Sequence, residues 1–377
     1  MSAAIAAARA GAHVKLIERT AGPGGTVSNV LIHTLGGLYD QDKQSLNGGL
    51  SAELADRLFK ASAQTRIRRI GKVYCLSVCP NVYRQVVERW IAEESRIDPL
   101  YETSIARLTL DRRRVVQCEA LSKRGSAELR LTALVDTTGT GEVVRLIDSS
   151  FVYDDEQRAA GGLIFRLRGV SPGTLAFPGS VTLVERLHEA ARQLQLPASC
   201  EHAWLDQGVH DDEVFVKLFV PLPDDWRNPA RLAEVAQQTV EIQAQVVSLL
   251  RKWPEFSNAQ LTETGVLGVR DGGRIRGEYY LTEQDVRAGR RFDDAACRCC
   301  WPIEYWHPSE GLQLEYLAEG DYYEIPLRAL QVRGLDNVWA AGKCLSADHK
   351  AQSSARIAGQ CWAMGESVGR VAAGLPC

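Results

Sequence analysis

The chain has 377 residues, of which 45% are hydrophobic and 24% charged, and its net charge is −3. This composition is typical of a globular protein long enough for two domains. It excludes the basic surface that binding to nucleic acid or to an anionic membrane requires. No apolar run approaches the roughly 20 residues that span a bilayer, and the alanine-rich start lacks the features of a signal peptide, so we expect a cytoplasmic location.

The ten cysteines are scattered, apart from the group Cys297, Cys299 and Cys300 and the pair Cys75 and Cys79. Neither group has the paired CxxC spacing of a zinc site or the CxxCxxC run of an iron–sulfur ferredoxin. We therefore expect reduced thiols, no metal site and no cluster.

The first 18 residues have the pattern of the second half of a dinucleotide-binding βαβ unit. An alanine-rich helix at 2–9 is followed by a turn at Gly11, a strand at 13–17 and an acid, Glu18. A carboxylate at this place accepts hydrogen bonds from an adenosine ribose. The strand and glycine-rich turn that precede such a helix are missing, which predicts either a protein without a phosphate cradle or a reading frame that starts upstream of Met1.

The next part of the chain alternates between helical and extended patterns. Apolar spacing predicts helices over 52–70 and 81–96, the second with Asn81 as N-cap. Strands at 105–111 and 115–122 then predict an antiparallel excursion, and a strand ending in "VDTTGTGEV" returns to the main sheet. In open α/β sheets ligands bind at the carboxyl ends of strands, where this acid, its threonines and its glycines gather.

Residues 151–328 differ in character, with strands between long helices and a rise in proline and aromatic content, so we interpret them as an inserted domain facing the substrate. The last part returns to a strand, a glycine turn and a helix. The fold class predicted is α/β, with a Rossmann-like nucleotide-binding domain made of 1–150 and 329–377 that lacks its first strand and GxGxxG turn. The insert at 151–328 is a mixed α/β substrate domain.

The C-terminal stretch "VWAAGKCLSADHKAQSSARIAGQ" has features of a cofactor site. Gly342 ends a strand, where the missing side chain lets backbone approach a ligand. Ser353 or Ser354 is expected to cap a helix whose N-terminal amides favour negative charge, such as that of a reduced flavin.

Four stretches together resemble a family of bacterial FAD-dependent oxidoreductases that is distantly related to the flavin subunit of heterodisulfide reductases. They are "VDTTGTGEV", "GVRDGGRIRGEYYLTEQDVRAGRRFDD", "WPIEYW" and "AAGKCLSADHKAQSSARIAGQCWAMGESVG". The resemblance implies a glutathione-reductase-like fold that binds FAD under a mixed α/β cap. The residues it assigns to the cofactor are Glu18 with Arg19 at the ribose, Gly24 and Gly25 near the flavin, Gly139 and Gly141 in an internal turn, and Gly342 with Lys343 near the ribityl and pyrophosphate.

The sequence departs from the family in three ways. The third glycine of GxGxxG would stand just before Met1. The family's "RESRRI" pattern is Arg270-Asp271-Gly272-Gly273-Arg274-Ile275 here, so that Gly273 replaces an arginine. The iron–sulfur cysteines of the relatives have no match, which does not support cluster binding.

Candidates for chemistry near a flavin are His349 and His33, because imidazole titrates near neutrality and can serve as acid or base. Each histidine also fits a structural role. Cys344 has no CxxC partner, so it too fits a structural role better than that of a redox thiol. Arg270, Arg274 and Arg276 are candidates either to bind an anionic substrate or to form structural ion pairs.

The leading hypothesis is an FAD-dependent oxidoreductase that exchanges hydride or electrons with a small organic substrate and an unidentified electron acceptor. One alternative is an NAD(P)-dependent dehydrogenase, and another is a truncated flavoprotein fold without catalytic activity. The expected partners are small molecules rather than nucleic acid or membrane, and homo-oligomers are left open.

Overall fold

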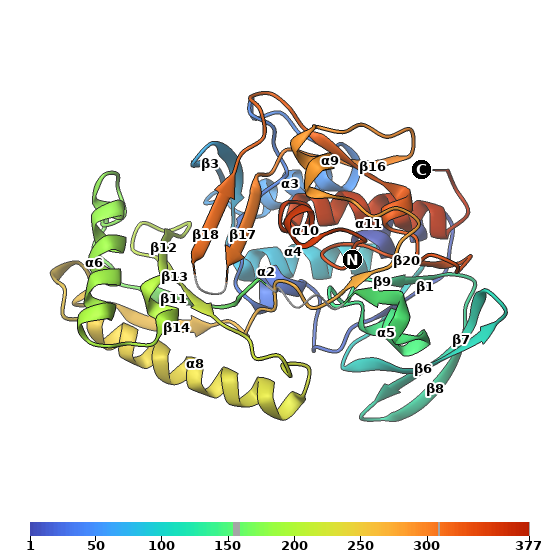
Figure 1. The fold of residues 1–377 in the computed structure, drawn as a ribbon, viewed down its shortest axis with the longest axis horizontal. Helices are drawn as coiled ribbons and strands as arrows, with labels where there is room; N and C mark the ends of the chain where they lie inside the picture. The colour runs from blue at the N-terminus through green and yellow to red at the C-terminus, as the bar shows by residue number, and fades with distance from the viewer. Residues whose placement is uncertain (154–158, 308–309, 377) are drawn as a thin grey trace.

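The structure is a computed structural model that describes residues 1–153, 159–307 and 310–376. Figure 1 shows a central body of helices and short strands around α10 and α11. On one side of this body lies a lobe with two long helices, α6 and α8, and on the other a three-stranded antiparallel sheet, β6 to β8. This arrangement confirms the predicted mixed α/β class.

Helix α1 (Ser2–Arg9) and strand β1 (Val14–Ile17) lie almost where the sequence predicts them. Strand β1 pairs in parallel with β5 (Ile97–Leu100). The alanine face of α1 is buried against helix α11 (Ala358–Ala372). A Cβ atom at Gly369 of α11 would lie 2.3 Å from the carbonyl oxygen of Ala3, so only glycine permits this crossing.

Between β1 and β5 the sequence-based prediction needs two corrections. The helix expected over 52–70 ends at Ala61, and its last five positions form strand β3, which pairs antiparallel with β4 across a turn at Gly71 with φ +59°. The helix expected from 81 has Cys79 rather than Asn81 as its N-cap, because Pro80 takes the first helical position. The elements here are α2 (Gly25–Asn29), β2 (Thr34–Leu35), α3 (Gly49–Ala61), β3 (Arg66–Ile70), β4 (Val73–Ser77) and α4 (Pro80–Glu93).

The antiparallel excursion is confirmed. The sheet has the order β6-β7-β8, and the chain then returns through β9, which pairs in parallel with β20 near the C-terminus. Helix α5 follows β9 directly. The bounds are β6 (Thr103–Asp111), β7 (Arg114–Ser122), β8 (Gly125–Arg130), β9 (Leu134–Asp136), α5 (Glu142–Ile147) and β20 (Val338–Ala340).

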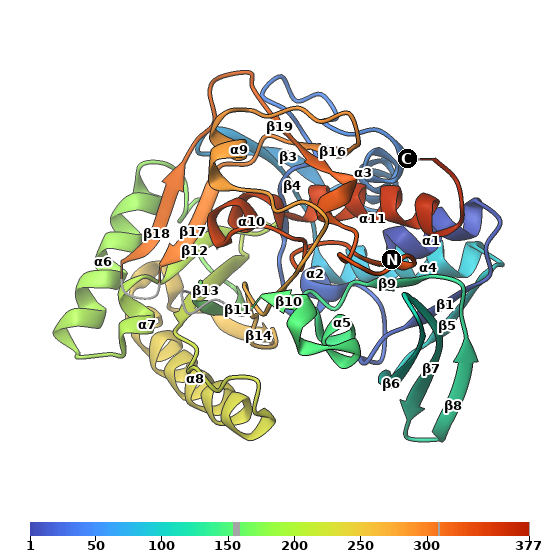
Figure 2. The same ribbon diagram turned by 45° about the vertical axis from the view of Figure 1, so that its right-hand side comes forward.

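The lobe beyond residue 160 is a four-stranded antiparallel sheet in the order β12-β13-β11-β14. Helices α6 and α8 belong to the same core, which includes Phe165, Leu187, Val216 and Leu250. In Figure 2 both helices lie outside the sheet strands, away from α11. The bounds are β11 (Gly161–Arg168), α6 (Gly179–Gln193), α7 (Ala198–Glu201), β12 (Trp204–Gln207), β13 (Val214–Val220), α8 (Pro229–Leu250) and β14 (Gln260–Thr264).

Most of the remaining chain packs on the C-terminal helices. Strand β16 pairs with β19, β17 pairs with β18, and their apolar side chains share a core with those of α10 and α11, including Ile325, Leu345 and Met364. The division of the chain at 151 and 328 stays a prediction. The bounds are β10 (Val152–Tyr153), β15 (Arg274–Ile275), α9 (Glu283–Arg287), β16 (Ala295–Cys299), β17 (Ile303–His307), β18 (Gly311–Glu315), β19 (Tyr323–Pro326) and α10 (His349–Ala355).

Candidate functional site

Two glycine turns lie side by side at the carboxyl ends of β9 and β20. In the parallel register Asp136 is opposite Ala340, so the turns containing Gly139 and Gly342 follow at the same edge, with φ values of +72° and +92°. A Cβ atom at Gly139 would lie 2.5 Å from Cε of Lys343. The structure therefore brings Gly139 together with Gly342 and Lys343, which follow about 200 residues later in the sequence.

Asp136 organises this edge, and the sequence analysis did not select it as a site residue. Its carboxylate is 1% exposed. One oxygen accepts hydrogen bonds from the amide and hydroxyl of Thr138 at 2.9 and 2.7 Å, and the other from the amides of Val143 and Val144, each at 3.0 Å. This carboxylate fixes the turn through Gly139 and Gly141 and satisfies the start of α5. The signal that reveals it is an acid at a strand end followed by threonine two residues later.

Glu18 lies at the end of β1, on the neighbouring parallel strand pair. Its Oε1 accepts hydrogen bonds from the amide and hydroxyl of Thr20, both at 2.8 Å. Glu18 also raises the pKa of the Met1 ammonium at the start of α1, against the larger lowering caused by burial. The acid thus faces the N-terminal end of the first helix, as the βαβ pattern predicts.

The loop after Glu18 turns toward α5 and α2. Arg19 is exposed, and its guanidinium lies 3.7 Å from the Glu142 carboxylate at the start of α5. Gly24 and Gly25 have φ values of +123° and +51°. A Cβ atom at Gly24 would lie 1.8 Å from Oγ of Ser28, so glycine is required where the loop enters α2.

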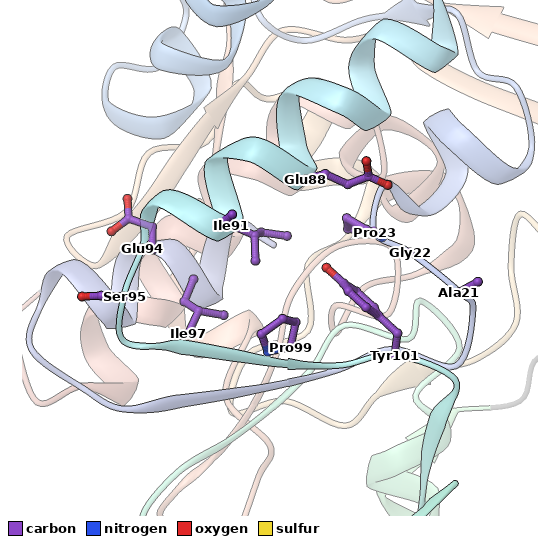
Figure 3. A pocket seen from close by; sticks show the side chains of 11 residues that line it. Ala21, Gly22, Pro23, Glu88, Ile91, Glu94, Ser95, Ile97, Pro99 and Tyr101 are labelled. Carbon is purple, nitrogen blue, oxygen red and sulfur yellow. The ribbon is translucent and has the colours of Figure 1, made fainter. Parts of the chain in front are cut away.

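A cavity of about 340 Å³ opens beside this loop. Figure 3 shows Gly22 and Pro23 on one side, Glu88 and Ile91 of α4 above, and Tyr101 below. Its remaining lining residues are Ala21, Ala92, Glu94, Ser95, Ile97 and Pro99. The volume is at the lower end of the range for small-molecule pockets.

The expected serine cap is wrong. Helix α10 begins at His349, and its N-cap is Asp348, whose carboxylate accepts a hydrogen bond from the Ala351 amide at 2.7 Å. Ser353 and Ser354 lie inside the helix and are buried. The Ser353 hydroxyl donates to the Lys350 carbonyl oxygen within the same helix, and the Ser354 hydroxyl donates to the carbonyl oxygen of Trp301. Neither caps the helix.

The two candidate histidines lie in different surroundings. His349 is half-buried at the start of α10, with its ring centroid 5.2 Å from that of Tyr305, and burial lowers its pKa. His33 is fully buried, stacks on Phe215 at 3.7 Å and places Nε2 3.2 Å from the Asp206 carboxylate. Burial also lowers the pKa of His33, with Asp206 opposing the shift. Only His349 retains partial access to solvent.

Three cations that the sequence analysis did not group together meet near α10. Lys343, Arg270 and Arg356 are each half-buried. Their side chains donate hydrogen bonds to backbone carbonyls: Lys343 to Val269 at 2.8 Å, Arg270 to Ala160 at 2.6 Å and to Gly161, and Arg356 to Glu304 at 3.2 Å. We call these three residues the cation cluster.

The surroundings of the cation cluster disfavour its positive charge. Burial lowers the pKa of Lys343 to about 8, with Arg356 adding to the shift. Burial and the neighbouring Arg356 lower the pKa of Arg270, and burial lowers that of Arg356. Within residues 1–153, 159–307 and 310–376, no carboxylate lies within 4.0 Å of these three charged groups. An anion would offset the cost of burying them.

The residues present fit a dinucleotide with a negatively charged diphosphate. Gly139 and Gly342 have positive φ at the strand ends, where such a fold lets backbone approach a ligand, and the Lys343 side chain packs against Gly139. A carboxylate at the position of Glu18 can accept hydrogen bonds from ribose hydroxyls. In the described part of the chain, no group of three or more His, Cys, Asp or Glu side chains is arranged to hold a metal ion.

An α/β fold with adjacent glycine turns at the ends of two parallel strands and an acid after the first strand is the arrangement of a nucleotide-binding protein. The particular family follows from comparison with known families. The model of the FAD dependent oxidoreductase family matches residues 1–375, and the chain belongs to that family. Its cofactor is FAD.

Several solved structures match nearly the whole chain at low sequence identity. A geranylgeranyl bacteriochlorophyll reductase-like protein from Thermoplasma acidophilum is 11% identical, covers 99% of this chain and 75% of its own, and has a TM-score of 0.47. The p-nitrophenol 4-monooxygenase from Pseudomonas putida DLL-E4 is 11% identical over 98% of this chain and 75% of its own, with a TM-score of 0.47. The flavin-dependent brominase Bmp2 is 11% identical over 100% and 77%, with a TM-score of 0.47.

No curated protein sequence matches the chain significantly. Among the helices that the structure describes, none combines the length and the apolar character that crossing a membrane needs.

Proposed function

We propose that the chain is an active FAD-dependent oxidoreductase that transfers a hydride or electrons between a small organic substrate and bound flavin. The observation that carries the proposal is the adjacent pair of turns at Gly139 and Gly342, with the Lys343 side chain packed against Gly139, in a chain of a family whose cofactor is FAD. When bound, FAD supplies the redox chemistry, because its isoalloxazine ring accepts and releases electrons.

The chain's own residues would divide the remaining work. Glu18 would accept hydrogen bonds from the ribose, while the loop through Arg19, Gly24 and Gly25 and the turns through Gly139, Gly141 and Gly342 would let backbone approach the cofactor. Ser354 would hold α10 in place through its hydrogen bond to the Trp301 carbonyl, while Ser353 bonds within the helix. These assignments place binding on loops and turns that the strands of the central body position.

We assign proton transfer to His349 ahead of His33. His349 is half-buried and its pKa is lowered, so its imidazole is neutral at pH 7 and available as a base. His33 has Phe215 stacked on one face and the Asp206 carboxylate beside Nε2. That environment suits a positioning residue that holds the loop before β2 against β13.

The proposal extends to the cellular setting. Eight cysteines in the described part of the chain are free thiols: Cys75, Cys79, Cys118, Cys200, Cys299, Cys300, Cys344 and Cys361. Free thiols are usual in a reducing compartment, and this supports a cytoplasmic location. The proposed partners are a small-molecule substrate and a separate electron acceptor.

The first test is the colour and flavin content of the purified protein. We expect flavin absorbance and about one FAD per chain after loading. Glu18→Gln is expected to weaken FAD binding about tenfold or more, because a charge-assisted hydrogen bond is lost. The exposed Glu128→Gln on β8 is the matched control and should bind FAD as the unmodified chain does.

Two results would contradict the proposal in different ways. A folded, colourless protein that added FAD does not restore rules out a resident flavin. A yellow protein whose flavin no organic substrate or dye acceptor reduces or reoxidises favours the alternative of a flavoprotein fold without activity.

A further inference from the structure

The three residues of the cation cluster come from three separate segments. Arg270 follows β14, Lys343 follows β20, and Arg356 ends α10. Arg270 lies with its guanidinium carbon 4.4 Å from the centroid of Trp306 in β17 and bonds to the carbonyls that begin β11. The cluster therefore stands where the lobe, β17 and the C-terminal helices meet.

The nearest acids are engaged by other donors. The two oxygens of Glu304 accept hydrogen bonds from the indole nitrogens of Trp301 and Trp306, each at 2.9 Å. Asp271 lies 3.5 Å from Nε of Arg274. Glu304 and Asp271 raise the pKa values of the cluster's arginines only through space, so positive charge is in excess here.

Arg270 and Arg356 also disfavour each other's charge, since two guanidinium groups close together repel. Burying two like charges without an anion between them is costly. Planar guanidinium groups bind carboxylate or phosphate oxygens in a bidentate way, and a bound oxyanion would remove both the repulsion and the lack of a partner.

We propose that Arg270 and Arg356, with Lys343 beside them, form a subsite for an oxyanion carried by the substrate, most simply a carboxylate. The inference rests on the proposed function, because it names the substrate class of the same site. The same chemistry could come from the diphosphate of FAD itself. The backbone of Arg270 adjoins Lys343 through Gln352, but its guanidinium contacts Trp306 and the carbonyls that begin β11, and this orientation toward the lobe favours the substrate as the source.

The test is an anion titration of the FAD-loaded protein at constant ionic strength, with acetate, succinate and inorganic phosphate as probes. The readouts are the flavin absorbance spectrum and the melting temperature. We expect saturable changes in both with a carboxylate probe, and about tenfold weaker binding in Arg356→Gln and in Arg270→Gln. The affinity for FAD should stay within twofold in both variants.

Two variants serve as controls. Arg276→Gln removes a cation of the same segment, which stacks on Tyr153 at 4.0 Å instead of joining the cluster, and it should respond to the probes like the unmodified chain. Arg356→Lys keeps the positive charge and should retain part of the response even where Arg356→Gln folds poorly.

The proposal is overturned if the FAD-loaded chain gives no saturable response, or if Arg356→Gln responds as Arg276→Gln does. It is also overturned if the glutamine variants lose FAD affinity while the loaded wild-type chain ignores all three probes, because the cluster then holds the FAD diphosphate. If the chain binds no FAD, the proposed function fails, and the melting temperature with succinate still decides whether the cluster binds an oxyanion.

Discussion

Two groups of charged side chains in this molecule differ in how their charge is balanced. In the first, the Asp206 carboxylate of β12 lies 3.0 Å from Arg68 of β3, 3.0 Å from Lys217 of β13 and 3.2 Å from His33. In the part of the chain that the structure describes, the charged groups of the cation cluster bond only to backbone carbonyls. We infer that a balanced group holds elements together, whereas an unbalanced one provides binding energy for a ligand.

The largest expected effect is a loss of folding stability when the group around Asp206 is disrupted. Asp206→Ala leaves Arg68 and Lys217 without their carboxylate, and removing one partner of a largely buried ion pair destabilises by about 3 kcal/mol. Urea unfolding of the purified protein measures this loss. Asp211→Ala, an exposed acid four residues after β12 ends, is the control and should change stability by less than about 0.5 kcal/mol. Equal effects of the two variants would remove the distinction between the groups.

The second prediction concerns how the folding stability changes as the pH falls. Burial lowers the pKa of His33, so below about pH 6.5 the unfolded chain binds a proton that the folded chain does not, and stability falls as pH falls. Between pH 7.5 and 5.5 we expect His33 to account for a loss of about 1 kcal/mol, which His33→Gln removes. The exposed His13→Gln should retain the slope. If the dependence of stability on pH is unchanged in His33→Gln, His33 is already protonated in the folded state because the Asp206 carboxylate stabilises its positive charge.

The third prediction concerns how the affinity of the cation cluster for an anion changes as the pH rises. The pKa of Lys343 is lowered to about 8, so the ammonium loses its charge as pH rises through that value. Succinate affinity of the FAD-loaded chain should fall severalfold from pH 7 to pH 9.5. Lys343→Met, compared at saturating FAD because Lys343 also adjoins the Gly139 turn, should bind succinate more weakly at pH 7 and lose most of this dependence. A pH profile that Lys343→Met leaves intact would assign the change to another group.

The smallest expected effect is on the stability of the cation cluster itself. Arg356→Gln removes a charge that has no carboxylate partner and repels Arg270, so the free energy of unfolding should change by less than about 1 kcal/mol and can rise. The comparison with Asp206→Ala in the same urea series tests the contrast directly. A loss as large as that of Asp206→Ala would mean that Arg356 is chiefly structural.

Local pattern was sufficient for much of the fold. The first helix and strand, the antiparallel excursion and the return of the chain to β9 and β20 were predicted because each has a short-range signature in its apolar spacing and its turns. The prediction that the helix continues to residue 70 was wrong because Arg66–Ile70 forms a strand that pairs with β4. Local helical spacing gives no information about this pairing. The serine cap failed because Asp348 lies earlier and offers a carboxylate to the same helix end.

The candidate site was predictable only in part. Each glycine turn follows a strand and can be recognised alone, but the contact between Gly139 and Lys343 depends on the parallel pairing of strands about 200 residues apart. From the sequence, Arg270 was a candidate because of its motif and Lys343 because of its glycine turn, but Arg356 was not a candidate. Their common feature, a lack of carboxylate partners, exists only after tertiary folding brings three distant segments together.

The crossing of α1 and α11 has a consequence for the order of folding. Because Gly369 must lie against Ala3, the apolar face of the first helix stays uncovered until the last helix has been synthesised. The central body can therefore close only after α11 has been synthesised, whereas the four-stranded lobe, whose strands all lie between residues 161 and 264, has its core residues available earlier. A ribosome-bound chain ending near residue 340 should protect the lobe from proteolysis and leave α1 accessible.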